Sequence, residues 1–312
     1  MKTMKKAIAF ILMVALVFSL VAVFTACDWF QTKDENFEYS KKDDGTYMVL
    51  EYLGSDEDVV IPSTFKGKEV TDIWEDSFRG KDFVKSIKVS KNIKMLRNWG
   101  TRSLKVVTFE EGSQLEEISL QTFMNCELEY IELPVSLTKI GHDAFHSLPT
   151  TISYAGTLEE FLSIDGIDVL MGDSHYTTNE KLLIGGQEMK NLVIPEGLTK
   201  IMADFSSCPW LESVTIGQGP VNVGGFSYNS NLKTVDITGN SVTDIWGLNN
   251  CEKLTSVSLP ASLKEIHSPA FSNCPQLTSV NFAGTMEQWK AIKGRSALSG
   301  EIIRCSDGDI EQ

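Results

Sequence analysis

The residues best able to do chemistry are six cysteines, and four of them recur at one position of a repeating pattern. Three of these four stand three residues before a leucine, and the set is Cys126, Cys208, Cys251 and Cys274. A cysteine that recurs in this way is expected to point inward and to bond to the backbone of a turn. Cys251 and Cys274 would lie one coil apart, with α-carbons about 5 Å from each other, so parallel side chains disfavour a disulfide but leave it open. Cys305 is predicted to be a free or partly buried thiol.

The four histidines give no metal site by their spacing. His142 and His146 are four residues apart, which suits a metal ion on a helix, but they flank Phe145, which is expected in the core. Two surface histidines are therefore the better interpretation, and His175 and His267 stand elsewhere in the sequence. The chain also has no Gly-rich phosphate loop, no G-x-S-x-G and no HExxH motif. We predict no metal, no cofactor and no enzymatic activity.

Three tryptophans are candidate aromatic contacts for a ligand. Trp74 and Trp246 each follow an isoleucine of the repeat, and Trp210 follows Cys208-Pro209 in an expected turn. Exposed aromatic rings can stack on sugars or anchor a protein partner. The alternative is that these rings only fill space over the turns.

A repeat of 21 to 23 residues must position all of these side chains. Its pattern is L-x-x-I-x-x-x-A-F-x-x-C-x-x-L-x-x-V-x-L-P, seen most fully in residues 263–282. Copies begin at Val70, Leu115, Leu137, Leu198, Val221, Val242 and Leu263, with a weaker copy over 93–109. A fixed period of this length is the sequence signature of a stacked solenoid. Three copies replace the Ala-Phe pair, at 98–100, 224–226 and 246–248, and are expected to form shallower coils.

Each unit contains a short strand in which apolar and polar residues alternate. No unit can enclose its own apolar face, so stacked units are expected to share one core and to align their strands as a parallel sheet. The outward residues of that sheet form the candidate ligand face. They are Tyr130, Glu132, Thr215, Asp236, Ser258 and Asn281.

The repeat resembles a known family. Pro134-Val-Ser136-Leu137 and Pro260-Ala-Ser262-Leu263, with the Ala-Phe and Cys that follow in the pattern, resemble the BspA-like (treponemal-type) leucine-rich repeats of bacterial surface proteins. The resemblance covers roughly residues 46 to 312. It implies a mainly β, right-handed leucine-rich-repeat coil with short strands and turns. It says little of function, because one fold carries many functions.

Two segments outside the repeat period are near copies of each other. Residues 157–164 and 285–292 each begin with T-x-x-E or T-x-x-Q, the capping box of a helix start, and then place apolar residues on one face. We expect two short capping helices, each followed by a polar loop and an apolar strand. The chain would then contain two modules, 46–185 and 186–312. The loop over 166–181, with Asp173, His175 and Tyr176, is an alternative binding loop.

The N-terminus indicates export. Lys2, Lys5 and Lys6 precede an uncharged run that ends at Ala26, which is typical of a signal peptide over 1–26. Cys27 follows small residues and resembles the lipidated cysteine of bacterial lipoproteins, although Phe24 stands where that motif has leucine. An uncleaved membrane anchor is the alternative. Residues 27–45 are polar and are expected to be a flexible spacer between the lipid and the fold.

The charge of the exported part narrows the choice of partners. Without the three lysines of the signal peptide, 25 basic residues face 42 acidic ones, a net charge of −17. Such a surface repels phosphate backbones and anionic lipid, so nucleic acid is excluded and the membrane is reached only through the lipid. We predict an extracytoplasmic, membrane-anchored protein that mediates protein–protein interaction or adhesion at the cell surface. The alternative is a carbohydrate-binding module that uses its tryptophans.

Overall fold

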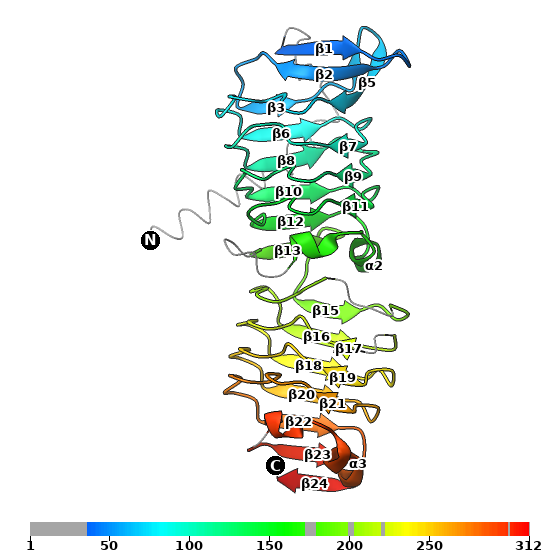
Figure 1. Ribbon diagram of the computed structural model, residues 1–312, viewed down its shortest axis with the longest axis vertical. Helices are drawn as coiled ribbons and strands as arrows, with labels where there is room; N and C mark the ends of the chain where they lie inside the picture. The colour runs from blue at the N-terminus through cyan, green and yellow to red at the C-terminus, as the bar shows by residue number, and fades with distance from the viewer. Residues whose placement is uncertain (1–35, 172–178, 199–202, 220–221, 299, 312) are drawn as a thin grey trace.

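Stacked coils of short strands form the body of the chain, as seen in a computed structural model (Figure 1). The structure describes residues 36–171, 179–198, 203–219, 222–298 and 300–311. Strands of successive coils pair in parallel and in register, and they build two long sheets and two short sheets that run along the solenoid. The predicted mainly β leucine-rich-repeat solenoid is confirmed.

The first long sheet and its companions occupy the N-terminal half. It contains β3 (Asp58–Val60), β6 (Ser86–Val89), β8 (Val106–Phe109), β10 (Tyr130–Leu133), β12 (Thr151–Tyr154), β13 (Lys181–Ile184) and β14 (Gln187–Glu188). The short sheet beside it contains β7 (Met95–Leu96), β9 (Glu117–Ile118) and β11 (Lys139–Ile140). A four-stranded sheet covers the N-terminal end with β1 (Phe37–Lys41), β2 (Tyr47–Tyr52), β4 (Thr64–Phe65) and β5 (Lys68–Ile73).

The second half repeats this arrangement. Its long sheet contains β15 (Asn191–Ile194), β16 (Ser213–Ile216), β18 (Thr234–Ile237), β20 (Ser256–Leu259), β22 (Ser279–Phe282), β23 (Ile302–Cys305) and β24 (Gly308–Glu311). Its short sheet contains β17 (Asn222–Val223), β19 (Asp244–Ile245) and β21 (Glu265–Ile266). The two long sheets are separate, since no pairing joins β14 to β15.

Alternation along each strand explains the shared core. In β10, Ile131 and Leu133 are buried while Tyr130 and Glu132 are only partly covered, and the other central strands follow the same pattern. Large rings stack through the first half at 5.1 to 6.0 Å between ring centres, in the order Tyr52, Phe78, Trp99, Phe123 and Phe145.

The coils that lack the Ala-Phe pair still fill this inner position. Trp99, Phe226 and Leu248 replace the phenylalanine of the pattern, and each is at most 1% exposed. A buried apolar side chain therefore still fills the core position in each of these coils, although Leu248 is smaller than phenylalanine.

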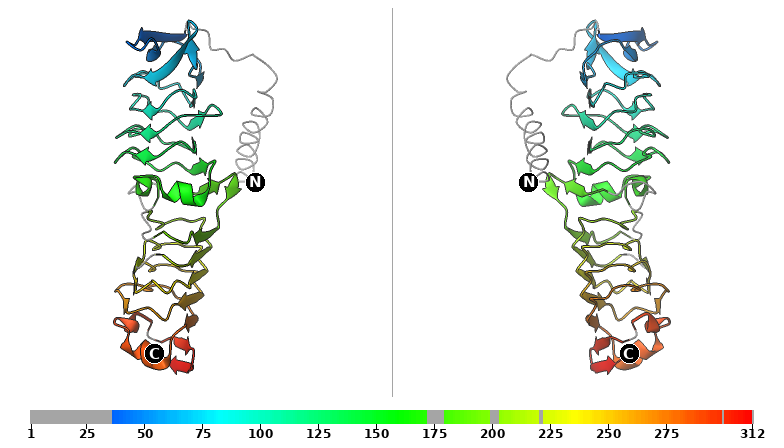
Figure 2. Two further views of the ribbon diagram at one scale, coloured as in Figure 1. Left: turned by 90° about the vertical axis from the view of Figure 1, so that its right-hand side faces the viewer. Right: turned by 90° about the vertical axis from the view of Figure 1, so that its left-hand side faces the viewer.

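Two caps interrupt or end the stack, one at mid-length and one at the C-terminal end (Figure 2). The predicted helices are α2 (Leu158–Leu162) and α3 (Met286–Ala291), followed by the 3₁₀ helices η2 (Ile167–Leu170) and η3 (Arg295–Leu298). Both predicted capping boxes form, Thr157 with Glu160 and Thr285 with Gln288.

A hairpin closes each cap, and sequence analysis missed its second strand. β14 and β24 return antiparallel to β13 and β23. The expected module boundary at 185/186 therefore falls in a hairpin turn, and β14 still belongs to the first sheet.

The N-terminal boundary of the fold also differs from the expectation. Residues 37–41 lie within the predicted flexible spacer, but β1 pairs antiparallel with β2 and Phe37 is buried against Tyr52, with 5.2 Å between ring centres. The aromatic residues of this segment therefore belong to the end of the core. The signal peptide, Cys27, and the loop residues Asp173, His175 and Tyr176 lie outside the described residues. Within the described part, no helix is long and apolar enough to cross a membrane.

The first capping box contains a carboxylate that the second lacks, so we expect it to respond to pH. Hydrogen bonds from the backbone N–H (2.8 Å) and hydroxyl (3.0 Å) of Thr157 hold the pKa of Glu160 below its ordinary value of 4.5. A lowered folded-state pKa contributes stability above the unfolded pKa, and this stability is lost as the pH falls through the folded value. Glu160→Gln should keep the box, as Gln288 does, and lose this part of the acid sensitivity.

Urea denaturation at neutral and at acidic pH checks this expectation. The loss of unfolding free energy on going below pH 4.5 should be smaller for Glu160→Gln than for the wild type, and larger for the reciprocal Gln288→Glu variant. Equal pH profiles for all three proteins would contradict it.

Candidate functional site

The outward face of the second long sheet carries one continuous row of side chains. The row consists of Val193, Thr215, Asp236, Ser258, Asn281 and Arg304, each a direct register partner of the next. Its four central members are partly exposed. On each of their strands, the residues directly before and after the row member are buried. Because paired strands lie about 4.8 Å apart, the row is a regular strip that is polar at every position except the exposed Val193. We call it the sheet row.

The other two predicted face residues lie on the other long sheet. Tyr130 and Glu132 are both on β10, and neighbouring strands partly cover them. Desolvation raises the pKa of Tyr130 and of Glu132 above their ordinary values, while the charge of Lys88 acts against the shift at Glu132. The structure thus brings four of the six predicted residues together and places the remaining two in the first half.

An ion-pair ladder borders the sheet row. Glu212, just before β16, lies between Lys190 and Lys233, with its carboxylate oxygens 3.9 and 2.5 Å from their amine nitrogens. The hydrogen bond from Lys233 lowers the pKa of Glu212. Exposed ion pairs of this kind contribute little to stability, so the ladder matters chiefly as alternating charge beside the row.

The three tryptophans divide into two classes. Trp74 and Trp246 are 55% and 51% exposed, as the prediction of aromatic contacts requires. Trp210 is 5% exposed and packs edge-on against Phe205, with 6.3 Å between ring centres. The expectation that Trp210 contacts a ligand is wrong, because its turn directs the ring into the core beside the buried Leu211.

Trp246 lines an open pocket of about 540 Å³ together with Asn222, Asp244 and His267. The pocket lies on the outward face of the second short sheet, where Asn222 and Asp244 are register partners. The indole lies against the backbone of the preceding coil at Gly224. Any side chain at position 224 would collide with the ring. One face of the ring is therefore supported by the fold.

Two carboxylates and an imidazole meet beside this pocket. Asp244 and Glu265 are register partners across β19 and β21. His267 directs Nε2 toward Asp244 Oδ1 at 3.3 Å and Nδ1 toward Glu265 Oε1 at 3.5 Å. Imidazole and carboxylate are ligands for transition metals. We call these three residues the His267 cluster.

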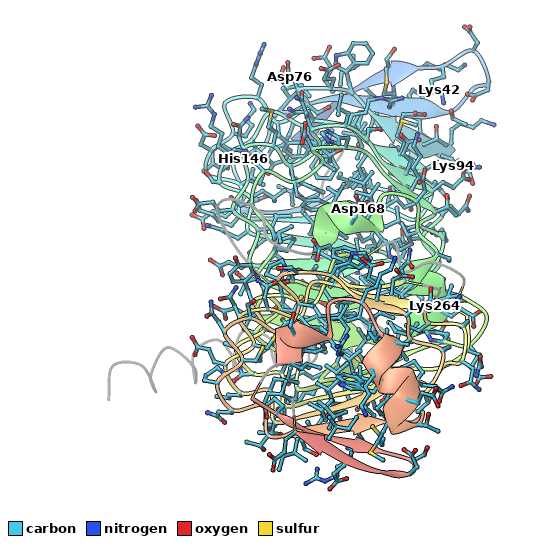
Figure 3. All side chains as sticks on the ribbon, turned by 60° about the horizontal axis from the view of Figure 1, so that its bottom comes forward. Lys42, Asp76, Lys94, His146, Asp168 and Lys264 are labelled. Carbon is cyan, nitrogen blue, oxygen red and sulfur yellow. The ribbon has the colours of Figure 1, made fainter. Side chains whose placement is uncertain are left out.

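Sequence analysis missed the His267 cluster and found no metal-ligand spacing. The signal lay in the repeat period, since Glu265 and His267 follow Asp244 and Trp246 by one 21-residue coil. Figure 3 shows Lys94 and Lys264 on the side of the solenoid that carries the short sheets, and His146 on the other side. His142 instead contacts its neighbour Asp143, 2.9 Å from Nδ1 to the carboxylate.

Three of the four recurring cysteines bond to backbone carbonyl groups of the preceding coil, and the fourth, Cys208, lies 3.7 Å from the carbonyl oxygen of Ser206 in its own turn. The thiols of Cys126, Cys251 and Cys274 lie 3.2 to 3.3 Å from the carbonyl oxygens of Thr101, Phe226 and Leu248. This confirms the predicted structural role of the position. Burial raises the pKa of Cys126 to about 12, which keeps that thiol protonated and unreactive.

Cys251 and Cys274 are free thiols in the structure, like the partly exposed Cys305. A hydrogen bond with Cys251 lowers the pKa of Cys274 to about 7. The same bond and burial raise the pKa of Cys251.

Comparison with solved structures finds distant relatives in fold, all of them at most 20% identical to this chain. A Treponema pallidum leucine-rich repeat protein is 19% identical, with 80% of each chain covered and a TM-score of 0.33. A leucine-rich cell surface protein of Faecalibacterium prausnitzii is 20% identical, over 84% of this chain and 97% of that one, with a TM-score of 0.29. The pneumococcal vaccine antigen PcpA is 18% identical, over 88% and 87% of the two chains, with a TM-score of 0.44. The search of curated proteins gave no relative.

A family model assigns the repeat directly. The model of the BspA-type leucine-rich repeat region matches six copies over residues 71–163 and 180–292. These ranges contain both short sheets and most strands of the two long sheets. The chain therefore belongs to the BspA-type leucine-rich repeat family.

Proposed function

We propose that this protein is a membrane-anchored, extracytoplasmic scaffold that recognises a protein partner at the cell surface. The sheet row is the observation that carries the proposal. It presents polar and charged groups at a fixed spacing on a rigid parallel sheet, and pre-organised groups lose little conformational freedom on binding. The basic N-terminus and Cys27 support export and lipid anchoring.

The charge of the chain narrows the partner. The net charge of −17 on the exported part favours association with a basic protein surface, because complementary potentials accelerate encounter and exclude acidic partners. Asp236 is the acidic member at the middle of the sheet row, flanked by the small hydroxyl side chains of Thr215 and Ser258. A basic side chain of the partner can therefore reach Asp236 without displacing a large neighbour.

Reversing the charge at Asp236 should weaken partner binding at least tenfold, about 1.4 kcal/mol. Binding to a panel of purified extracellular-matrix and envelope proteins is measured by surface plasmon resonance for the wild type and Asp236→Arg. Glu252→Arg is the matched control, since it makes the same charge change at an exposed turn just before β20. The proposal fails if no member of the panel binds the wild type, or if the two variants behave alike.

The exposed Trp74 and Trp246 favour a second candidate, carbohydrate binding. A glycan array probed with the wild type, Asp236→Arg and a double tryptophan variant separates protein binding from carbohydrate binding. A glycan ligand held by these rings would be lost in the double variant Trp74→Ala/Trp246→Ala and kept in Asp236→Arg. Glycan binding that survives loss of both rings would eliminate this candidate.

A further inference from the structure

The outward face of the second short sheet contains an arrangement that the proposed function does not use. We propose that the His267 cluster, Asp244, Glu265 and His267, binds a divalent transition-metal ion such as Zn²⁺. The cluster lies on β19, on β21 and on the residue that follows β21, away from the sheet row.

The geometry of the cluster suits a metal of this class. One ligand atom from each of the three residues lies within 4.8 Å of the others. His267 Nε2 and Asp244 Oδ1 are 3.3 Å apart. If a zinc ion were bonded to both atoms at about 2.1 Å, the angle between the two bonds at the ion would be roughly 105°, close to the tetrahedral value. Glu265 Oε1 lies 3.5 Å from Nδ1, the ring nitrogen that would not bind this ion, so the flexible Glu265 side chain has to turn toward Asp244 to become the third ligand.

Neighbouring groups hold one carboxylate in position. The hydroxyl of Thr243 donates a hydrogen bond to Asp244 Oδ2, which leaves Oδ1 toward His267. Such outer contacts fix the orientation of metal ligands and support their affinity. All three residues remain partly or fully exposed, so an ion can enter from solvent.

The two short sheets differ in how the charges of facing residues are balanced. In the first short sheet, the register partners Glu117 and Lys139 form an ion pair of 3.4 Å. At the matching place in the second sheet, Asp244 faces the like charge of Glu265, an arrangement that is unfavourable between opposed strands. Lys293 is the backbone partner of Glu265 on its other side, but among the described residues no lysine or arginine nitrogen lies within 4.0 Å of either carboxylate. A divalent cation would remove this repulsion.

The chain contains a natural control for this environment. The pentapeptide Val-Thr-Asp-Ile-Trp occurs at 70–74 and again at 242–246. In the first copy, the carboxylate of Asp72 lies 2.6 Å from Lys42 and 4.0 Å from Arg97, so fixed cations already neutralise it. In the second copy, those neighbours are replaced by Glu265 and His267. The same local sequence thus presents an ion-paired aspartate, Asp72, in its first copy and a metal ligand, Asp244, in its second.

Metal titration of the purified, untagged, chelator-treated protein tests the site. Isothermal titration calorimetry with Zn²⁺ should show one bound ion per chain, and His267→Ala and Asp244→Asn should each weaken binding tenfold or more. Trp246 lines the same pocket, so Ni²⁺ should quench part of the tryptophan fluorescence in the wild type. Trp246→Phe should lose the quenched part and keep its Zn²⁺ affinity within about twofold, since the indole is no ligand.

Two further variants control for binding elsewhere. Asp72→Asn alters the first copy of the pentapeptide, and His142→Ala removes the other exposed histidine–aspartate contact. Both should bind Zn²⁺ like the wild type. Circular dichroism checks that every variant is folded. We expect His267→Ala to fold normally, because the His267 side chain is exposed. Absence of saturable Zn²⁺ binding by the wild type, or binding that survives His267→Ala, would overturn the proposal.

Discussion

Replacing Trp99 by alanine should lower the free energy of unfolding by about 3–5 kcal/mol, the usual cost of removing a large buried aromatic ring. Trp99 is 1% exposed and lies between Phe78 and Phe123, with ring centres 6.0 and 5.9 Å away. The substitution therefore opens a cavity in the column of rings and removes two aromatic contacts. Because each coil contacts only its neighbours, the loss falls on the interfaces on both sides of this coil.

Urea denaturation followed by circular dichroism measures the effect, with Trp74→Ala as control. Trp74 is 55% exposed, so its truncation should change the unfolding free energy by no more than about 0.5 kcal/mol. Trp99→Phe should recover most of the loss, because phenylalanine fills this position in the next coil and the buried indole N–H has no partner among the described residues. A Trp99→Ala protein as stable as Trp74→Ala would refute this account of the core.

Replacing Gly166 by alanine should cost about 2–5 kcal/mol, for two separate reasons. Its φ of +76° disfavours any L residue by about 1–2 kcal/mol. A Cβ would also overlap the carbonyl oxygen of Ile140 in the preceding coil, and such overpacking adds about 1–3 kcal/mol. Gly294 is in the same situation against Ile266 in the second cap, so Gly294→Ala should behave alike.

Gly186 isolates the conformational part of this cost. It has the same φ of +76°, but a Cβ there would meet nothing within 4 Å. Gly186→Ala should therefore lose only about 1–2 kcal/mol in the same denaturation experiment. If Gly166→Ala and Gly186→Ala lose equal stability, the close approach of the coils contributes nothing.

The repeat period made the stack and the inward cysteines predictable. Both capping boxes lie outside that period, and they were predictable because each depends on residues close together in sequence. Thr157 and Glu160 are three residues apart, and so are Thr285 and Gln288. The return strands β14 and β24 were missed because they are short and mostly polar, and only the neighbouring strand gives them a partner. β1 was missed because its charged neighbours resembled a spacer.

The candidate site was only partly predictable for a different reason. The sheet row follows from alternation along each strand, so Thr215, Asp236 and Ser258 could be placed on one face. The direction of Trp210 depends on packing against Phe205 in the same coil, which no period reveals. The His267 cluster joins residues about one coil apart. Their proximity becomes visible only when successive repeats are aligned with one another.

The two hairpins determine where such a chain can lengthen by duplication. A coil inserted between β20 and β22 would find parallel partners on both sides, with every inward residue in its usual register. A coil added after β24 would meet an antiparallel strand and the acidic residues Asp309 and Glu311 instead. Internal copies are therefore compatible with the architecture. Each inserted coil would lengthen the sheet row by one side chain without any change to the cap that follows β22.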